Sequence, residues 1–293
     1  MNNNNKTTDN LVQDIYELMV SKDADSSVDV EAEIDKFGEG VKALMRTEFG
    51  QEKRKDNRKL RLSNIGRTDR YLWNHFNGTE GEDILPHTYV KFMYGHLIEE
   101  MLLFLTRMTG HSVTDEQKVC KVNDIVGHMD CKIDGVVTDV KSASSYGFKK
   151  FKDATLVNDD SFGYIDQIKA YAKSEGERQV GWLTMDKANG HLTYLKYDLD
   201  NTDNDKLKED ITDRVDHIKA LVLGDEPKKY CYEPVPDGKS GNMKLATGCS
   251  YCQFKKQCYP SLRVFNYSYA PKVLCKVVKE PNVQEIILDE EGF

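Results

Sequence analysis

The sequence predicts an α/β protein in which a mixed sheet is flanked by helices. Helical patterns alternate with short apolar strands over most of the chain, which favours this class. Two of these strands meet at Asp134-Gly135, a dipeptide that strongly favours a tight hairpin. The composition, 39% hydrophobic and 31% charged, is that of a globular chain. No apolar run approaches the roughly 18 residues that a membrane span requires.

Apolar residues at helical spacing define the expected helices, and runs rich in β-branched and aromatic residues define the strands. The helices are expected at residues 10–21, 30–49 with an interruption near Gly38 and Gly40, 86–109, 164–174 and 202–222. Strands are expected at 127–133, 136–142, 180–185 and 191–197. In the helix over 86–109, a single stripe is expected to face the core, formed by Val90, Met93, Leu97, Met101, Phe104 and Met108.

The hairpin brings charged residues onto one face. If Asp134-Gly135 forms the loop, Asp130 lies opposite Asp139, with Cβ atoms about 5 Å apart. Lys141 shares this face because strand side chains alternate with period two. The same register places His128 opposite Lys141. Two facing carboxylates repel, and a divalent cation with oxygen ligands would relieve that repulsion.

These residues resemble the core of the PD-(D/E)XK nuclease superfamily. Gly127-x-x-Asp130 and Asp139-x-Lys141 match its central motif, with Gly95-x-x-x-Glu99 upstream. Gln167-x-x-x-Tyr171 is similar to the helix of the RecB-like and lambda-exonuclease-like branches. Residues 60–73 resemble the entry segment of phage and CRISPR-associated-exonuclease-like nucleases of the same superfamily.

The resemblance implies a restriction-endonuclease-like core and a DNA nuclease that uses Mg²⁺ or Mn²⁺. It implies that Glu99, Asp130, Asp139 and the Val140 carbonyl hold the metal, with Glu100 as the alternative to Glu99. Lys141, Gln167 and Tyr171 would complete the catalytic residues. The expected parts are a helical N-terminal region with a basic stretch (1–84), the nuclease core (85–225) and a cysteine-rich C-terminal region packed on the core (226–293).

The chain has seven cysteines, and Cys249-x-x-Cys252-x5-Cys258 groups three of them. A cytoplasmic location, in the host if the chain is phage-encoded, is expected, so these thiols are predicted to bind metal and not to form disulfides. Their spacing resembles that of iron–sulfur nucleases, whose fourth cysteine lies where this chain has Thr68-Asp69. Cys231 is the nearest substitute. Both a [4Fe–4S] cluster and Zn²⁺ stay open.

The net charge of −8 leaves DNA binding to local basic surfaces. A short stretch is crowded with Lys53, Arg54, Lys55, Arg58, Lys59, Arg61, Arg67 and Arg70. Contacts to DNA phosphates are expected from Arg61, Arg67, Arg70, Ser142 and Lys149. Three aromatic residues near Ser142 are candidates for base stacking: Tyr146, Phe148 and Phe151.

Three functions therefore stay open from the sequence. The first is an exonuclease of DNA replication, recombination or repair, of phage or host origin, that acts on single strands or duplex ends. Its expected partner is a single-strand-binding, annealing or helicase protein. No contact with a membrane is expected. The second is a structure-specific endonuclease. The third is a non-catalytic DNA-binding or scaffolding module with a relic nuclease core.

Overall fold

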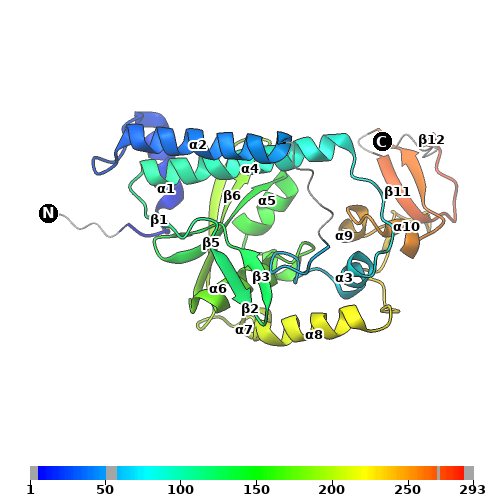
Figure 1. Cartoon of the computed structure of the whole chain (residues 1–293). Helices are drawn as coiled ribbons and strands as arrows, with labels where there is room; N and C mark the ends of the chain where they lie inside the picture. The colour runs from blue at the N-terminus through cyan, green and yellow to red at the C-terminus, as the bar shows by residue number, and fades with distance from the viewer. Residues whose placement is uncertain (1–5, 51–57, 269–270, 287–293) are drawn as a thin grey trace. The chain divides into compact units, whose positions relative to one another are not determined.

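The computed structural model describes residues 6–50, 58–268 and 271–286. The chain divides into two compact units (Figure 1). Unit 1 comprises Met1–Gly66 and Val90–Asp216, and unit 2 comprises Arg67–Tyr89 and His217–Phe293. Among the described residues, no helix has both the length and the apolar character that crossing a bilayer requires. The three-part division expected from the sequence stays a prediction.

Unit 1 is built on a five-stranded mixed sheet, as the sequence predicts. The strand order is β1-β4-β5-β6-β7. The strands are β1 (Val113–Thr114), β4 (Cys131–Ile133), β5 (Val136–Ala143), β6 (Gln179–Asp186) and β7 (Leu192–Asp198). Neighbouring strands are antiparallel except β5 and β6, which run parallel at the centre of the sheet.

The predicted hairpin at Asp134-Gly135 is confirmed. Ile133 pairs with Val136 and Cys131 with Thr138, which is the expected register. Asp134 has φ 48° and Gly135 has φ 84°, the left-handed conformations that a type I′ turn requires at both central positions. The Asp134 carboxylate compensates for this backbone conformation by accepting a hydrogen bond from the Ser112 backbone nitrogen at 3.0 Å.

The predicted position of His128 is wrong. A separate two-stranded sheet is formed by β2 (Val119–Val122) and β3 (Ile125–His128), in which His128 pairs with Val119 and not with Lys141. The chain changes sheets at Met129, whose side chain is fully buried. The register of the Asp134 hairpin therefore does not continue back to His128, whose side chain is exposed.

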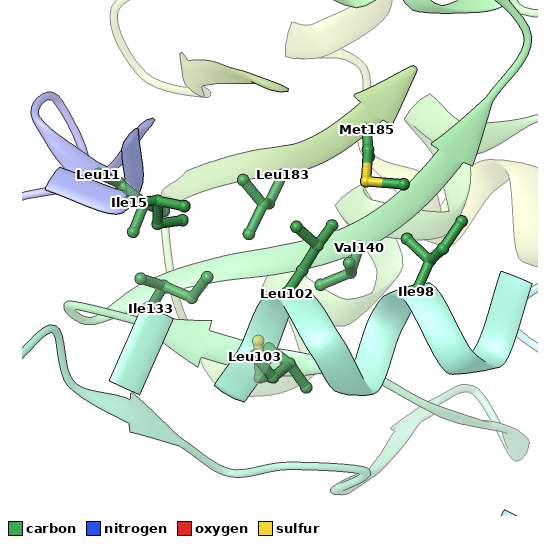
Figure 2. Close-up of a cluster of buried hydrophobic side chains, with 10 residues drawn as sticks. Leu11, Ile15, Ile98, Leu102, Leu103, Ile133, Val140, Leu183 and Met185 are labelled. Atoms are coloured by element: carbon green, nitrogen blue, oxygen red, sulfur yellow. The ribbon is translucent and has the colours of Figure 1, made fainter. Parts of the chain in front are cut away.

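Helices α1 (Leu11–Ser21) and α4 (Pro86–Met108) cover one face of the sheet. Figure 2 shows Leu11 and Ile15 of α1, and Ile98 and Leu102 of α4, around Val140, Leu183 and Met185 of the central strands. A further long helix, α2 (Val30–Phe49), lies beside α4 (Figure 1) and runs without a break at Gly38 or Gly40. The glycines do not interrupt it because the remaining residues favour a helix.

The predicted core stripe of α4 is right at Met101, which packs against the core, but the fully buried face is shifted by one position. The buried residues are Ile98, Leu102, Leu103, Thr106 and Arg107, whereas Val90 is 59% exposed. Phe104, from the predicted stripe, instead contacts Phe37 of α2, with ring centroids 5.2 Å apart. The helix has two adjacent apolar faces, one for the sheet and one for α2.

The opposite face of the sheet is covered by α5 (Ser145–Lys152) and α6 (Tyr164–Glu175), with the short 3-10 helix η1 (Leu156–Asn158) between them. On β6 this face carries Trp182, whose ring lies 6.3 Å from that of Phe151 in α5. The single helix expected over 202–222 is two helices, α7 (Asp205–Lys208) and α8 (Ile211–Leu223). They separate at Asp210, whose carboxylate accepts a hydrogen bond from the Thr212 backbone nitrogen and caps α8.

Unit 2 contains α3 (Asp69–Phe76) and an antiparallel sheet of order β12-β10-β11-β9-β8. Its strands are β8 (Val235–Pro236), β9 (Met243–Lys244), β10 (Arg263–Asn266), β11 (Pro271–Lys276) and β12 (Glu285–Ile286). Two short helices, α9 (Thr247–Ser250) and α10 (Lys255–Cys258), lie between β9 and β10 in sequence. Phe254, 2% exposed, packs edge-on against Tyr71 of α3 at 5.5 Å.

Candidate active site and cysteine cluster

Strand β5 carries Asp139 and Lys141 at the centre of unit 1. The side chain of Asp139 is 1% exposed, and its Oδ2 lies 2.6 Å from Lys141 Nζ. Its Oδ1 accepts a hydrogen bond from Gln167 Nε2 at 3.3 Å. Burial disfavours the charged Lys141 ammonium, but Asp139 and Asp130 outweigh this effect and raise its pKa above the ordinary value. The lysine is therefore held as a cation next to a buried acid.

Asp130 lies immediately before β4 and reaches across to β5. Its Oδ2 accepts a hydrogen bond from the Val140 backbone nitrogen at 2.7 Å, which fixes the carboxyl one residue beyond Asp139. The pKa of Asp139 is raised to about 7, first by burial and then by Asp130, against the lowering effect of Lys141. The two aspartates are thus close neighbours, as the hairpin register predicts.

Glu99 joins the two aspartates from α4. Its Oε1 accepts a hydrogen bond from Gln117 Nε2 at 3.0 Å. The pKa of Glu99 is raised to about 8 by burial, then by the charges of Asp130 and Asp139, while Lys141 lowers it. Three carboxyls therefore share one partly buried region with a single ammonium.

The alternative glutamate, Glu100, points elsewhere. The Glu100 carboxylate packs so closely against Gly40 of α2 that a Cβ atom at that position would overlap with it. Burial raises the pKa of Glu100, and the next contribution comes from Glu116, outside the aspartate pair. Of the two glutamates, the structure brings Glu99 to the aspartates.

Gln167 and Tyr171 lie on one face of α6, as their spacing predicts. Gln167 Nε2 lies 3.3 Å from the Tyr171 hydroxyl and 3.3 Å from Asp139 Oδ1. Burial raises the pKa of the Tyr171 phenol, and the Asp139 charge adds to this effect. The start of α6 is fixed by Asp160, whose carboxylate accepts hydrogen bonds from the backbone nitrogens of Gly163 and Ile165, both at 2.8 Å. The tyrosine, the glutamine and the acid therefore form one chain of contacts.

A divalent cation fits this group of residues by its donor chemistry. Asp139 Oδ2 is buried and accepts no hydrogen bond, although the Lys141 ammonium lies 2.6 Å away. As they stand in the described part of the chain, no three His, Cys, Asp or Glu side chains are arranged to hold a metal ion. Lys141 now balances the Asp139 charge. Glu99, Asp130, Asp139 and the Val140 carbonyl would supply the hard oxygen ligands that Mg²⁺ prefers.

The residues expected to contact DNA are distributed over both units. Ser142 is half-buried at the end of β5, and Lys149 of α5 is exposed, as is Arg61. Of the three aromatic residues proposed for base stacking, Phe148 and Phe151 are buried and Tyr146 is 64% exposed. Stacking by Phe148 and Phe151 is therefore wrong because both fill the core beneath α5. Lys53, Arg54 and Lys55 lie outside the described residues.

Sequence reasoning missed two residues that adjoin this site. In the parallel pairing of β5 and β6, Trp182 is the partner of Asp139 and Thr184 is the partner of Lys141. Paired residues share a face of the sheet, so both side chains lie on the face of the acid and the lysine. A tryptophan and a threonine in a buried strand carry no sequence signal of their own. The order and register of the strands would have been needed to find them.

The four cysteines predicted to bind metal all belong to unit 2 and lie near enough to influence one another electrostatically; they are called the cysteine cluster below. Burial raises the pKa of the Cys249 thiol to about 12, and Cys231, Cys252 and Cys258 add to the shift. Burial likewise raises the pKa of Cys252 to about 11, with contributions from Cys231 and Cys258. The Cys252 sulfur accepts a hydrogen bond from the Phe254 backbone nitrogen at 3.4 Å. The four thiols are therefore neighbours, although their side chains in the described part of the chain do not stand in a metal-binding arrangement. The role of Cys231 as the fourth ligand stays a prediction.

Arg67 and Arg70 lie beside this cluster. Arg67 lowers the pKa of Cys252, and Arg70 lowers that of Cys258, in each case against the larger effect of burial. Arg70 also pairs with Glu226 at 2.6 Å and donates to the Lys228 carbonyl at 3.3 Å. These bonds fix the segment that leads to Cys231. The role of both arginines in DNA binding stays a prediction.

Comparisons with known proteins add only distant similarities. No protein-family model matches the chain, and a search of curated proteins finds no match. The fold is similar to the crystal structure of SSO0001, at a TM-score of 0.38 and 12% identity, over 75% of this chain and 94% of that one. It is also similar to LHK-Exo in complex with dAMP, at a TM-score of 0.37 and 11% identity, over 57% and 91%.

A second structure of LHK-Exo, an alkaline exonuclease from Laribacter hongkongensis, has a TM-score of 0.32 and 13% identity, over 57% of this chain and 90% of that one. Similarities at this level establish neither a shared activity nor a shared substrate.

Proposed function

We propose that this protein is a metal-dependent deoxyribonuclease that hydrolyses DNA phosphodiester bonds at the site around Asp139. One observation supports the proposal above all others. Asp139 is 1% exposed and lies against Lys141, with two further carboxyls, Asp130 and Glu99, beside it. Burying several like charges destabilises a fold, and strongly shifted pKa values in such a cluster are typical of functional sites.

The acidic residues would hold the cation. Asp130, just before β4, and Asp139, in β5, are close neighbours. Glu99 would reach the ion from α4, and the Val140 carbonyl would add a backbone ligand. When bound, a divalent cation polarises the scissile phosphate, lowers the pKa of a water molecule and stabilises the leaving oxygen. Hydrogen bonds donated by the Val140 backbone nitrogen to Asp130 and by the Gln167 amide to Asp139 fix the two aspartates in advance, which reduces the reorganisation needed for binding.

Lys141 would act on the substrate. Its ammonium lies on the same face as Asp139 and is one-fifth exposed, so it can reach both the carboxylates and the solvent side. A cation at this position neutralises charge on the phosphate and orients an attacking water molecule. Gln167 would hold Asp139 in orientation, and Tyr171 would support Gln167.

DNA would be bound by groups around the end of β5. Ser142 and Lys149 offer a hydroxyl and an ammonium to backbone phosphates, and Arg61 offers a further cation. The exposed Tyr146 ring can stack on an unpaired base, which a duplex end or a single strand provides. We therefore propose exonuclease action on DNA ends, as part of replication, recombination or repair.

The test is incubation of linear and circular DNA with the protein, with Mg²⁺ or Mn²⁺ in one set and EDTA in the other. Loss of linear DNA alone, only with metal, is expected. Loss of both forms would show an endonuclease. Loss of neither, with retained DNA binding, would overturn the enzyme proposal in favour of a binding module.

A second proposal concerns the thiols of unit 2. We propose that Cys231, Cys249, Cys252 and Cys258 hold a metal centre, either Zn²⁺ or a [4Fe–4S] cluster, that stabilises this unit. Both accept four thiolates, and Arg67 and Arg70 offer positive charge to balance them. Metal analysis with a visible absorption spectrum separates the two: a brown protein containing iron and sulfide, or a colourless one with zinc.

A further inference from the structure

Unpartnered polar atoms concentrate on one face of the central sheet. Among the described residues, four side-chain nitrogen or oxygen atoms are buried without a hydrogen-bond partner: Arg70 Nε, Asp139 Oδ2, Trp182 Nε1 and Thr184 Oγ1. Asp139 belongs to the proposed catalytic pair, and its Oδ2 has the Lys141 ammonium at 2.6 Å as an ionic partner. Trp182 and Thr184 lie beside that pair on β6. A buried polar atom without a partner destabilises the fold, so each one calls for a physical explanation.

Thr184 lies beside Lys141. The two residues are paired across the parallel strands, so they share one face. Strands in a sheet lie about 4.8 Å apart. The Thr184 side chain is fully buried, and its hydroxyl could accept a hydrogen bond from an ammonium that approaches from β5. On the other side, the ammonium lies 5.2 Å from the centre of the Tyr164 ring.

Lys141 needs a second position if Asp139 binds a cation. Its ammonium now lies 2.6 Å from Asp139 Oδ2, so it balances the charge that a divalent ion would balance instead. An ammonium and a divalent cation cannot both lie against that oxygen, because they repel each other. The lysine must then move away from Asp139 while remaining close enough to act on the phosphate.

We propose that the Thr184 hydroxyl accepts a hydrogen bond from the Lys141 ammonium when Asp139 engages a cation, which makes Thr184 a positioning residue for the catalytic lysine. This inference rests on the proposed nuclease function. It also explains why a buried hydroxyl is kept without a partner in the metal-free arrangement. Thr184 would free Asp139 by giving the lysine an alternative acceptor.

The proposal predicts opposite effects on stability and activity. Thr184→Val keeps the shape of the side chain and removes an unpartnered hydroxyl, so the melting temperature should be unchanged or higher. The kcat for DNA cleavage should fall at least about tenfold with an unchanged KM, since the lysine loses its acceptor. Thr184→Ser restores the hydroxyl and should recover most of the activity.

Thr193→Val is the matched control. Thr193 pairs with Thr184 from β7, on the same face and one strand further from Lys141. It should cleave DNA at the wild-type rate. Wild-type kcat in Thr184→Val would overturn the proposal, as would a Thr184→Ser variant as inactive as Thr184→Val.

A measurement without catalysis separates this inference from the nuclease proposal. Titration with Mn²⁺ alone should show affinity at least about threefold weaker in Thr184→Val, because Lys141 then competes more strongly for Asp139. In a Lys141→Met background, Thr184→Val should have no effect on affinity. An equal loss in both backgrounds, or no loss in either, would overturn the role of Thr184. A wild-type protein that binds Mn²⁺ but cleaves no DNA would overturn the nuclease proposal and leave the titration result decisive for Thr184.

Discussion

Asp139 contacts two neighbours of different kinds, the charged Lys141 and the neutral amide of Gln167. The amide orients one carboxylate oxygen without balancing its charge, and the other oxygen faces the ammonium. Removal of one partner from a buried ion pair usually destabilises a protein because it leaves an uncompensated charge. Here Asp130 and Glu99 lie near enough to compensate Lys141, so the local fold should tolerate a neutral residue at position 139.

Asp139→Asn should therefore separate catalysis from folding. We expect DNA cleavage to fall by at least about a hundredfold, because the variant lacks a charged cation ligand. Its melting temperature should stay within about 4 °C of the wild type, the shift that roughly 1 kcal/mol produces. Cleavage of labelled linear DNA with Mn²⁺ and a thermal melt measure the two quantities.

Asp186→Asn is the control for this substitution. Asp186 is another buried aspartate of the same sheet, 2% exposed, at the end of β6. Its carboxylate accepts a hydrogen bond from the Ala188 backbone nitrogen at 2.9 Å, and an asparagine side chain can retain it. We expect full activity. Normal cleavage by Asp139→Asn, or equal inactivity of both variants, would contradict the role of Asp139.

Individual residues differ in how far the sequence reveals them. Asp134 and Gly135 are predictable because few residues adopt positive φ, so the dipeptide itself fixes the turn and the pairing of its flanking strands. Thr184 is not predictable, because its place beside Lys141 depends on the parallel pairing of β5 with β6. That pairing joins residues 43 positions apart in the sequence. His128 was misplaced since the turn fixes only the residues that remain in its own hairpin.

Among the elements, α6 connects the candidate active site to the segment between α7 and α8. One face presents Gln167 and Tyr171 to Asp139, and Lys173 pairs with Asp210 at 3.0 Å. Asp210 also caps α8 through the Thr212 backbone nitrogen at 2.9 Å. The pKa of Asp210 is lowered to about 2, first by the hydrogen bonds from Thr212 and then by Lys173.

Asp210→Asn should make stability less dependent on acid pH. Because the folded-state pKa of about 2 lies below the ordinary 3.8, the ionised carboxylate stabilises the fold above about pH 4. That contribution is lost as pH falls toward 2. Asparagine keeps a capping oxygen but lacks the charge, so its deficit in melting temperature relative to wild type should be largest near pH 6 and shrink below pH 4.

Thermal melts of both proteins from pH 6 to pH 3 measure this difference. Glu209→Gln, which removes the same charge one residue earlier and leaves the Thr212 cap intact, is the control and should keep the wild-type melting temperature at pH 6. A deficit for Asp210→Asn that stays constant over this range would contradict the assignment of the cap. It would then reflect side-chain shape alone.

The sequence predicts the positions of most helices and strands, but it does not always predict which face of a helix packs against the sheet. The apolar period of α4 locates the helix, yet it cannot tell which of two apolar stripes meets the sheet, and the structure selects Ile98 and Leu102. The break at Asp210 escaped prediction because capping competes with a continuous apolar pattern there. The short strands of unit 2, several of two residues, carry too little periodicity to be found.

At the scale of the whole molecule, the chain has a net negative charge and two local clusters of side chains that favour different types of metal ion. The carboxyl cluster of unit 1 favours a hard cation, and the thiol cluster of unit 2 favours a soft one. Each unit has its own sheet. A metal in one unit can therefore be removed and its effect measured on that unit.

Cys249→Ser should destabilise unit 2 and leave unit 1 folded. A structural zinc site contributes about 10–16 kcal/mol of binding free energy in small domains, so loss of one ligand should unfold or precipitate this part of the chain. The measurements are bound metal per chain and hydrogen exchange of each unit. Cys275→Ser, on β11 of the same unit, is the control and should keep the metal.

A Cys249→Ser protein that keeps its melting behaviour and contains no metal would contradict the structural role of the cluster. The gathering of Cys249, Cys252 and Cys258 is predictable from their spacing alone. Cys231 has no such spacing signal, and the nearby contacts of Arg70 to Glu226 and Lys228 are revealed only by the folded chain. Its part in the metal site stays a prediction.

The imidazole of His111 is fully buried between two acids, 3.0 Å from Asp14 of α1 and 2.7 Å from Asp134 in the hairpin turn. The first helix is thereby tied to the turn that sets Asp130 against Asp139, although it lies more than a hundred residues away in sequence. A chain shortened by its first 22 residues would leave Asp134 with a buried histidine that lacks its second acid, and would uncover the sheet where Leu11 and Ile15 pack. Helix α1 therefore stabilises the hairpin that carries Asp130 and Asp139, and its removal should destabilise the site.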